Sequence, residues 1–234
     1  MTPTTTTRSP SSGDTVAVPV WDWPVRLFHW SIVALLAAAV VTAKIGGNAM
    51  EWHMRSGMTA LTLVLFRILW GFAGGRHARF ASFVRGPAAV IGYLRSIARP
   101  PHDLHVGHNP MGGWAVIAML LALLAQAVSG LFSNDDIATD GPLAHLVSKG
   151  ASDATTSFHH LNAWVLAALV AAHVAAVAFH RVALKEDLVR AMVSGRKTLP
   201  SRHAASGAGP TANARALLLL ALAAFAVWWI VNRL

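Results

Sequence analysis

Four histidines lie within long apolar segments, where an ionisable side chain is costly and is therefore a candidate for function. They are His29, His53, His159 and His173, out of 12 histidines in a chain of 234 residues. The chain has no cysteine, which excludes disulfides, thiolate zinc sites, iron–sulfur clusters and haem attached through thioether bonds. Imidazole nitrogens are therefore the predicted ligands of any metal or redox cofactor.

The spacing of two of these histidines places both rings on one face of a helix. Residues 159 and 173 are 14 apart, so at about 100° per residue they fall roughly 40° short of four turns and lie about 21 Å apart along the axis. His160 would be about 140° out of line with His173, and His180 would lie about 31 Å from His159, the whole hydrocarbon depth. The spacing favours His159 and His173 as ligands at two depths.

Five apolar segments are long enough to carry these residues across a bilayer, which takes about 20 residues. Apolar residues make up 55% of the chain and charged residues only 12%, so lipid is the expected solvent. Irregular backbone cannot face lipid, and we therefore expect helices. The predicted spans are 25–44, 52–73, 113–133, 158–180 and 214–231.

The distribution of basic residues predicts the orientation. The chain has 19 Lys and Arg against 10 Asp and Glu, a net charge of +9. The basic residues lie mainly in loops 74–112 and 181–213, whereas loop 45–51 has none and loop 134–157 has only Lys149. The positive-inside rule then places the N-terminus and both basic loops in the cytoplasm of a bacterial inner membrane. Charges placed between apolar spans indicate lipid contacts rather than a nucleic acid.

Composition also divides the chain into four parts. Residues 1–19 are rich in Thr, Ser and Pro and are predicted to be disordered. Residues 20–198 form the main transmembrane domain, 199–213 a flexible linker, and 214–234 an additional transmembrane helix. A basic interfacial helix is expected after Pro87.

Topology pairs the four histidines by depth. The second and fourth spans enter from outside, so His53 and His159 lie near the outer face. The first span enters from the cytoplasm, so His29 lies on the inner side, and His173 reaches the same depth. Each pair predicts a bis-imidazole site for one non-covalent b-type haem, which favours electron transfer because the iron has no open position. The expected fold class is an all-α membrane protein, a four-helix transmembrane bundle that binds two b haems, plus one extra C-terminal helix.

Three further residues are candidates for haem contacts. Gly57 follows His53 by four residues on the same face, where a missing side chain lets a porphyrin lie close to the backbone or lets helices pack closely. Arg26 and Arg67 lie near the cytoplasmic ends of their spans, and either snorkel to the interface or hold haem propionates.

Several motifs together resemble the bacterial cytochrome b561 / nickel–iron hydrogenase cytochrome b subunit family. These motifs are VWDWPVRLFHW (20–30), HMRSG in the second span, FRILWGFAGGRHARFASFVRGP (66–87), GHNPMGG (107–113) and FHHLNAWVLAALVAAHVAAVAFHR (158–181). The resemblance covers about residues 18–198. It implies a four-helix bundle with two b haems, whose axial ligands are His29, His53, His159 and His173. The fifth span is an addition to the family pattern, and the FHH start of the fourth span leaves His159 and His160 both open.

The resemblance also implies a role as an electron-transfer subunit rather than a stand-alone enzyme. Electrons would move between membrane quinone and a periplasmic redox partner, such as a c-type cytochrome or a hydrogenase. Superoxide oxidation with quinone as the acceptor is the alternative within the family. His108, Asn109 and Gly112 would contribute to a cytoplasmic quinone pocket near the inner haem, and a turn with a helix cap is the other interpretation of this segment.

Two other classes fit the residues less well. A histidine-rich metal or proton transporter predicts carboxylates beside the histidines inside the membrane, and the five predicted spans contain none. A desaturase-like metal enzyme predicts histidines clustered at one depth, whereas these four divide between two leaflets.

Overall fold

Five long helices dominate the computed structural model, which describes residues 15–97, 105–137, 139–209 and 211–233. All five are long and apolar enough to cross a membrane: α1 (Trp23–Ile45), α2 (Met50–Ala73), α5 (Pro110–Leu131), α6 (Lys149–Val182) and α8 (Asn213–Arg233). They confirm the five predicted spans, and their ends agree within three residues except at the start of α6. This helix begins at Lys149 because Ser148 caps it, its side chain accepting a hydrogen bond from the backbone N–H of Ala151. Hydropathy does not register such polar first turns.

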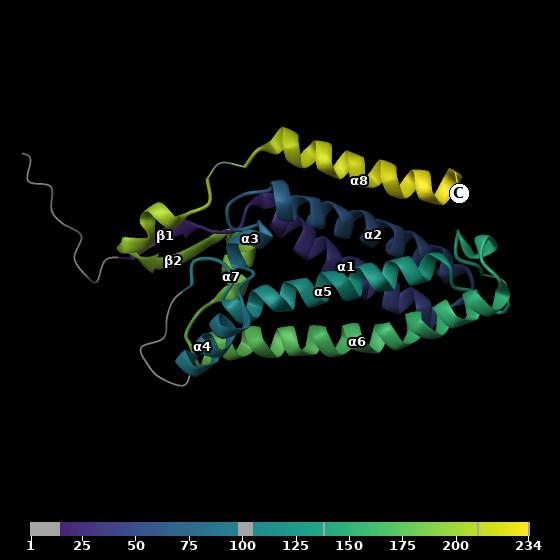
Figure 1. The fold of residues 1–234 in the computed structure, drawn as a ribbon, viewed down its shortest axis with the longest axis horizontal. Coiled ribbons are helices and arrows are strands. Elements are labelled where there is room, and N and C mark those ends of the chain that lie inside the picture. Colours follow the sequence, from purple (N-terminus) through teal and green to yellow (C-terminus); the bar gives the residue numbers. More distant parts are fainter. Residues whose placement is uncertain (1–14, 98–104, 138, 210, 234) are drawn as a thin grey trace, which may run out of the picture.

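Shorter elements connect the long helices and gather mainly at one end of the molecule (Figure 1). They are β1 (Thr15–Pro19), η1 (Gly47–Ala49), α3 (Phe80–Phe83), α4 (Pro87–Ile97), η2 (Ala144–Leu146), α7 (Leu188–Ser194), β2 (Arg196–Pro200) and η3 (Ser201–Ser206). The helix α4 confirms the helix expected after Pro87.

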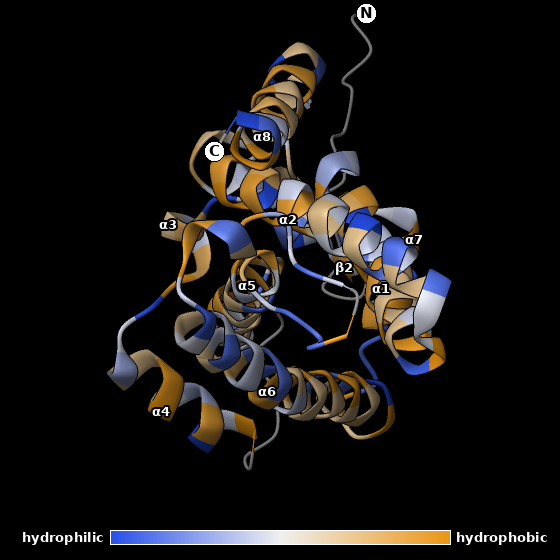
Figure 2. Cartoon of the chain, turned by 90° about the vertical axis from the view of Figure 1, so that its right-hand side faces the viewer, coloured by the Kyte–Doolittle hydropathy of each residue, from blue (hydrophilic) through white to orange (hydrophobic). Residues whose placement is uncertain are grey.

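The helices α1, α2, α5 and α6 form the bundle, and α8 lies outside it along α2 (Figures 1 and 2). All four bundle helices contribute to a shared apolar core, which contains Ile32 of α1, Val64 of α2, Leu120, Ala122 and Leu123 of α5, and Leu166 of α6. The outer helix α8 approaches α2 through small buried residues such as Ala216 and Ala223, as is usual where helices pack closely in a membrane.

The motif VWDWP fixes the start of the bundle. Asp22 caps α1 by accepting a hydrogen bond from the backbone N–H of Val25, and its second oxygen accepts one from the indole Nε1 of Trp70 at 3.0 Å. An N-cap of this kind contributes about 0.5–2 kcal/mol, and leaving a buried indole N–H unpaired costs about 1–3 kcal/mol. One buried carboxylate therefore joins the first turn of α1 to the last turns of α2.

The N-terminal segment differs in part from its predicted disorder. Residues 15–19 form β1, which pairs antiparallel with β2 from Thr15 opposite Pro200 to Pro19 opposite Arg196. The first part of the predicted linker 199–213 is ordered too, since it completes β2 and forms η3. The partner strands are about 180 residues apart in the sequence, so local composition could not reveal the pairing. Residues 1–14 lie outside the described part of the chain.

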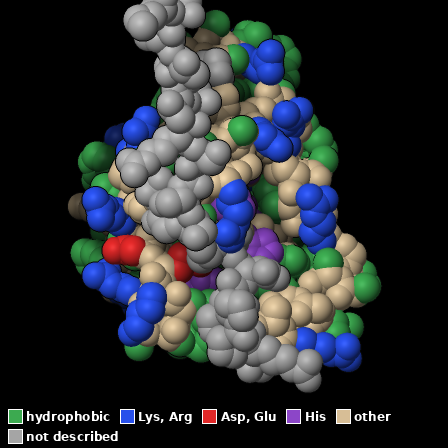
Figure 3. Space-filling model, turned by 90° about the vertical axis from the view of Figure 1, so that its left-hand side faces the viewer, with side chains coloured by type: hydrophobic (Ala, Val, Ile, Leu, Met, Phe, Trp, Pro, Cys, Tyr) green, Lys and Arg blue, Asp and Glu red, His purple; other side chains and the backbone are tan. Residues whose placement is uncertain are grey.

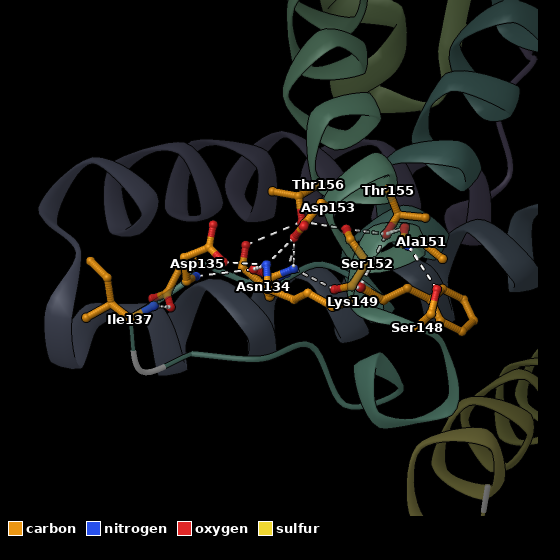
Figure 4. A network of polar contacts seen from close by, with 12 residues as sticks. Asn134, Asp135, Ile137, Ser148, Lys149, Ala151, Ser152, Asp153, Thr155 and Thr156 are labelled. Carbon is orange, nitrogen blue, oxygen red and sulfur yellow. Dashed lines mark hydrogen bonds and ion pairs between the residues drawn. The ribbon is translucent and has the colours of Figure 1, made fainter.

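The two ends of the bundle differ in charge. The end that carries β1, β2, α4 and α7 shows Lys and Arg side chains spread over its face, with few carboxylates and with histidines near the centre (Figure 3). At the other end, the α5–α6 loop and the start of α6 hold three carboxylates in internal contacts (Figure 4). Asp135 accepts hydrogen bonds from the backbone N–H groups of Ile137 and Thr139. Lys149 pairs with Asp136 and Asp153.

Candidate functional site

The structure brings the four histidines together as two pairs. His53 on α2 faces His159 on α6, with ring centroids 6.1 Å apart. His29 on α1 faces His173 on α6, with ring centroids 6.3 Å apart. Because α6 is continuous from one histidine to the other, the two pairs are about 21 Å apart along its axis. The pairs therefore lie at two depths of the bundle.

The separation within each pair matches a shared metal ion. An imidazole nitrogen binds a metal ion at about 2.0–2.1 Å and lies roughly 1.1 Å from its ring centre, so two rings that share one ion from opposite sides have centres about 6.3 Å apart. In the described ranges, no group of three or more ligating side chains forms a site for a bare metal ion. A haem fits two opposed imidazoles, because the macrocycle itself supplies the remaining four nitrogens.

Hydrogen bonds orient both rings of the His53–His159 pair. The Nδ1 atom of His53 lies 2.8 Å from the carbonyl oxygen of Ala39. The Nδ1 atom of His159 lies 2.9 Å from the carbonyl oxygen of Gln126 and 3.1 Å from the Ser129 hydroxyl. A ring whose Nδ1–H donates to a carbonyl presents its Nε2 atom as a metal ligand. His160 is exposed on the outside of α6, so the geometry favours His159 over His160.

Around the other pair, three buried polar atoms have no hydrogen-bond partner among the described residues. They are Nδ1 of His29, Nη1 of Arg67 and Nδ1 of His108. A buried polar atom without a partner costs about 1–3 kcal/mol, so these atoms point to a bound group. The Arg67 side chain is only 3% exposed and lies over the ring of Phe80. A buried guanidinium with an unpaired nitrogen fits the carboxylate of a haem propionate.

Arg26 has partners elsewhere. Its Nε donates to the carbonyl oxygen of Met192 at 3.3 Å, and its Nη2 donates to the carbonyl oxygen of Val193. These carbonyls belong to the last turn of α7, where a cation is favoured by the helix dipole. Arg26 and Arg67 both lie near the ends of their predicted spans. Only Arg67 of these two has a buried nitrogen without a partner among the described residues, so it is the better candidate to bind a propionate.

Two glycines shape the space beside the histidines. A Cβ atom added at Gly57 would meet nothing within 4 Å, so no neighbouring helix packs on the face of α2 one turn from His53, and a haem contact at Gly57 stays a prediction. The sequence did not indicate a role for Gly130 on α5. A Cβ atom there would lie 3.0 Å from Cε1 of His159, so a larger residue would press on the ring and shift it. Nothing in the sequence distinguishes Gly130 from an ordinary small residue of an apolar helix.

The segment GHNPMGG has the role of a helix cap and also borders a cleft. The Oδ1 atom of Asn109 accepts a hydrogen bond from the backbone N–H of Gly112 at 2.6 Å and caps α5, which confirms the cap interpretation. A cleft of about 380 Å³ opens at the basic end, lined by Arg76, His77, Phe83, Arg85, His105 and His108 among others. Burial, and then the charges of Arg67 and Lys197, lower the pKa of His108 to about 3, so its ring is neutral at physiological pH.

Comparison with known proteins gives one consistent family. A family model described as prokaryotic cytochrome b561 matches residues 20–195. The chain is 25% identical to the probable Ni/Fe-hydrogenase 1 B-type cytochrome subunit of Escherichia coli K12, over 80% of this chain and 93% of that protein. It is 27% identical to the probable Ni/Fe-hydrogenase B-type cytochrome subunit of Cupriavidus necator, over 80% and 90% of the two chains. No solved structure gives a significant match.

Proposed function

This chain belongs to the prokaryotic cytochrome b561 family, and we propose that it binds two haems and carries electrons through the whole bilayer. Membership of the family makes it a multi-pass membrane cytochrome of b type that serves electron transfer. The observation that carries this proposal is the pair of imidazole gaps, 6.1 and 6.3 Å between ring centres, at two depths of one bundle. When bound between two imidazoles, haem supplies a one-electron carrier without an open position for oxygen.

Each proposed ligand has a defined task. His53 and His159 hold the outer haem, and their carbonyl partners keep Nε2 directed into the gap. His29 and His173 hold the inner haem, with Arg67 beside them to neutralise a propionate. The matched residues 20–195 nearly coincide with the proposed domain of residues 20–198, to which α8 is an addition.

The charge distribution supports an orientation. We place the N-terminus and the basic end in the cytoplasm of a bacterial inner membrane, because positive loops remain there. The α5–α6 loop then faces the periplasm, next to the outer haem. The relatives are named as hydrogenase subunits, so a hydrogenase is the proposed periplasmic partner, with a c-type cytochrome as the other candidate.

Membrane quinone is the proposed partner at the cytoplasmic end. The cleft beside His108 lies at the same end as the inner pair and is lined by hydrogen-bonding side chains. The neutral ring of His108 offers a buried Nδ1 atom that has no partner among the described residues. A quinone oxygen is the kind of group that such an atom can bind.

Quinol oxidation by the purified protein tests this assignment. A short-chain quinol, added without oxygen, should reduce the haem, as followed by visible absorption. The variant His108→Ala should react about tenfold more slowly, the effect of one lost hydrogen bond of about 1.4 kcal/mol. His160→Ala, at an exposed position, should match the wild type. If quinol leaves the wild-type haem oxidised while dithionite reduces it, the quinone proposal is wrong.

A further inference from the structure

A second polar cluster lies at the basic end, apart from the proposed haem ligands. It joins Tyr93 of α4, His180 at the end of α6, Glu186 in the following loop and Lys197 of β2. Tyr93, His180 and Lys197 are each less than 9% exposed. So many titratable groups are seldom buried together unless they are paired, and here every one has a partner.

The hydrogen bonds fix the direction of this cluster. The carboxylate of Glu186 lies 2.9 Å from Nδ1 of His180 and accepts a hydrogen bond from Nζ of Lys197 at 2.6 Å. A carboxylate accepts only, so Nδ1 of His180 carries a proton, and in the neutral ring Nε2 is then an acceptor. Tyr93 Oη lies 3.3 Å from this Nε2 atom. The hydrogen bonds therefore run from the carboxylate of Glu186 through the imidazole of His180 to the hydroxyl of Tyr93.

Asn109 holds the hydroxyl end in place. Its Oδ1 atom is engaged by the backbone N–H of Gly112, so its amide nitrogen must point the other way. That nitrogen donates to Tyr93 Oη at 2.9 Å and lies 3.4 Å from Nε2 of His180. The capping residue of α5 thus also positions the phenol and the imidazole.

The cluster lies between solvent and the residues that line the cleft. The side chain of Glu186 is 17% exposed and forms the outer end. At the inner end, the ring of His105 stands edge-on to Tyr93, with centroids 5.4 Å apart. His105 and His108 both line the cleft. Asn109, which positions the phenol, is the next residue in the sequence after His108.

We propose that Tyr93, His180 and Glu186 form a proton relay between this cleft and the cytoplasmic water. The inference rests on the proposed quinone function and assigns its proton path. A quinol that becomes a quinone loses two electrons, which pass one at a time to the redox centres of the bundle, and two protons. Each proton moves to Tyr93 Oη as the phenol proton moves to Nε2 of His180, and the Nδ1 proton moves to Glu186 and then to water. The imidazole returns to its Nδ1–H tautomer before the second proton follows. Quinone reduction uses the same path in reverse.

Charges around the relay suit this task. Burial opposes the ionisation of Glu186, but the charge of Lys197 and the hydrogen bonds from Lys197 and His180 outweigh it and lower its pKa. Burial, and then the charge of Glu186, raise the pKa of Tyr93, so the phenol keeps its proton until a base takes it. A carboxylate that orients an imidazole toward a hydroxyl is the usual way to build such a base.

The test uses the full-length protein with its haems bound. The variants Tyr93→Phe, His180→Gln and Glu186→Gln each remove one relay group and change side-chain volume little. We expect quinol-driven haem reduction to slow by about 100-fold, the contribution of a positioned acid–base group, with an altered pH profile and a larger rate difference between H₂O and D₂O, because proton transfer then limits the rate. Haem content and absorption spectra should stay as in the wild type. Ser96→Ala serves as the matched control, because among the described residues its hydroxyl donates a hydrogen bond to the backbone carbonyl of Tyr93 and to no relay side chain.

A second measurement does not depend on turnover. Infrared difference spectra between the quinone- and quinol-bound forms should contain a carboxylate band in the wild type that Glu186→Gln abolishes and Tyr93→Phe weakens. The variants could instead bind haem and keep the wild-type rate, pH profile, isotope effect and infrared band. That result would show that the cluster stabilises the packing of α4 against α6 and carries no protons. If quinol fails to reduce the wild-type haem, the proposed quinone function is wrong, and the proton relay that depends on it is wrong as well.

Discussion

Replacing His173 by alanine should lower the haem content of the purified protein from two per chain to one. The ring of His173 lies 6.3 Å from that of His29, and an iron held between them would lose one of its two protein ligands. The outer pair lies about four helical turns away along α6 and keeps its carbonyl contacts. Extraction of haem, normalised to protein, measures the change directly.

Two further variants make this prediction specific. His159→Ala should remove the outer haem and leave the inner one, whereas His160→Ala should leave both, because His160 lies on the exposed side of α6. If His173→Ala retained both haems, or if His160→Ala lost one, the proposed ligand set would be wrong.

The variant Gly130→Ala should weaken the outer haem site although it replaces no proposed ligand. The new Cβ atom would lie 3.0 Å from Cε1 of His159 and 3.3 Å from its Nδ1 atom. The ring would have to move, and its 2.9 Å contact with the carbonyl oxygen of Gln126 would be strained. Loss of an orienting partner typically costs 10- to 100-fold in metal affinity, so we expect a loss of roughly that size in haem retention.

Transfer of haem to an excess of a haem-scavenging protein measures this retention. Gly150→Ala, in the first turn of α6, is the matched control, since its Cβ atom would meet nothing within 4 Å. Equal haem loss from the two variants would mean that Gly130 does not position His159.

Much of the bundle follows from periodicity and hydropathy. The five helices were predictable because a bilayer demands long apolar segments with internally paired backbones. The pairing of the histidines followed from two further regularities, the helical repeat between His159 and His173 and the alternation of span direction. Both regularities depend on local geometry, which can be predicted directly from a sequence.

Features that depend on distant contacts could not be predicted. Arg26 and Arg67 have similar positions near span ends, yet one contacts α7 and the other is buried with an unpaired nitrogen. The pairing of β1 with β2 joins segments from opposite ends of the family domain. His180 looked like a histidine placed too far along its helix, because Tyr93 and Glu186 approach it only in the folded chain.

Electron paramagnetic resonance of the oxidised, purified protein, combined with a haem count, tests the central claim most directly. Two imidazole pairs in one bundle predict two haems per chain, both low-spin because both axial positions of each iron are filled by nitrogen. A single haem per chain, or a high-spin signal from an iron with an open position, would contradict the account.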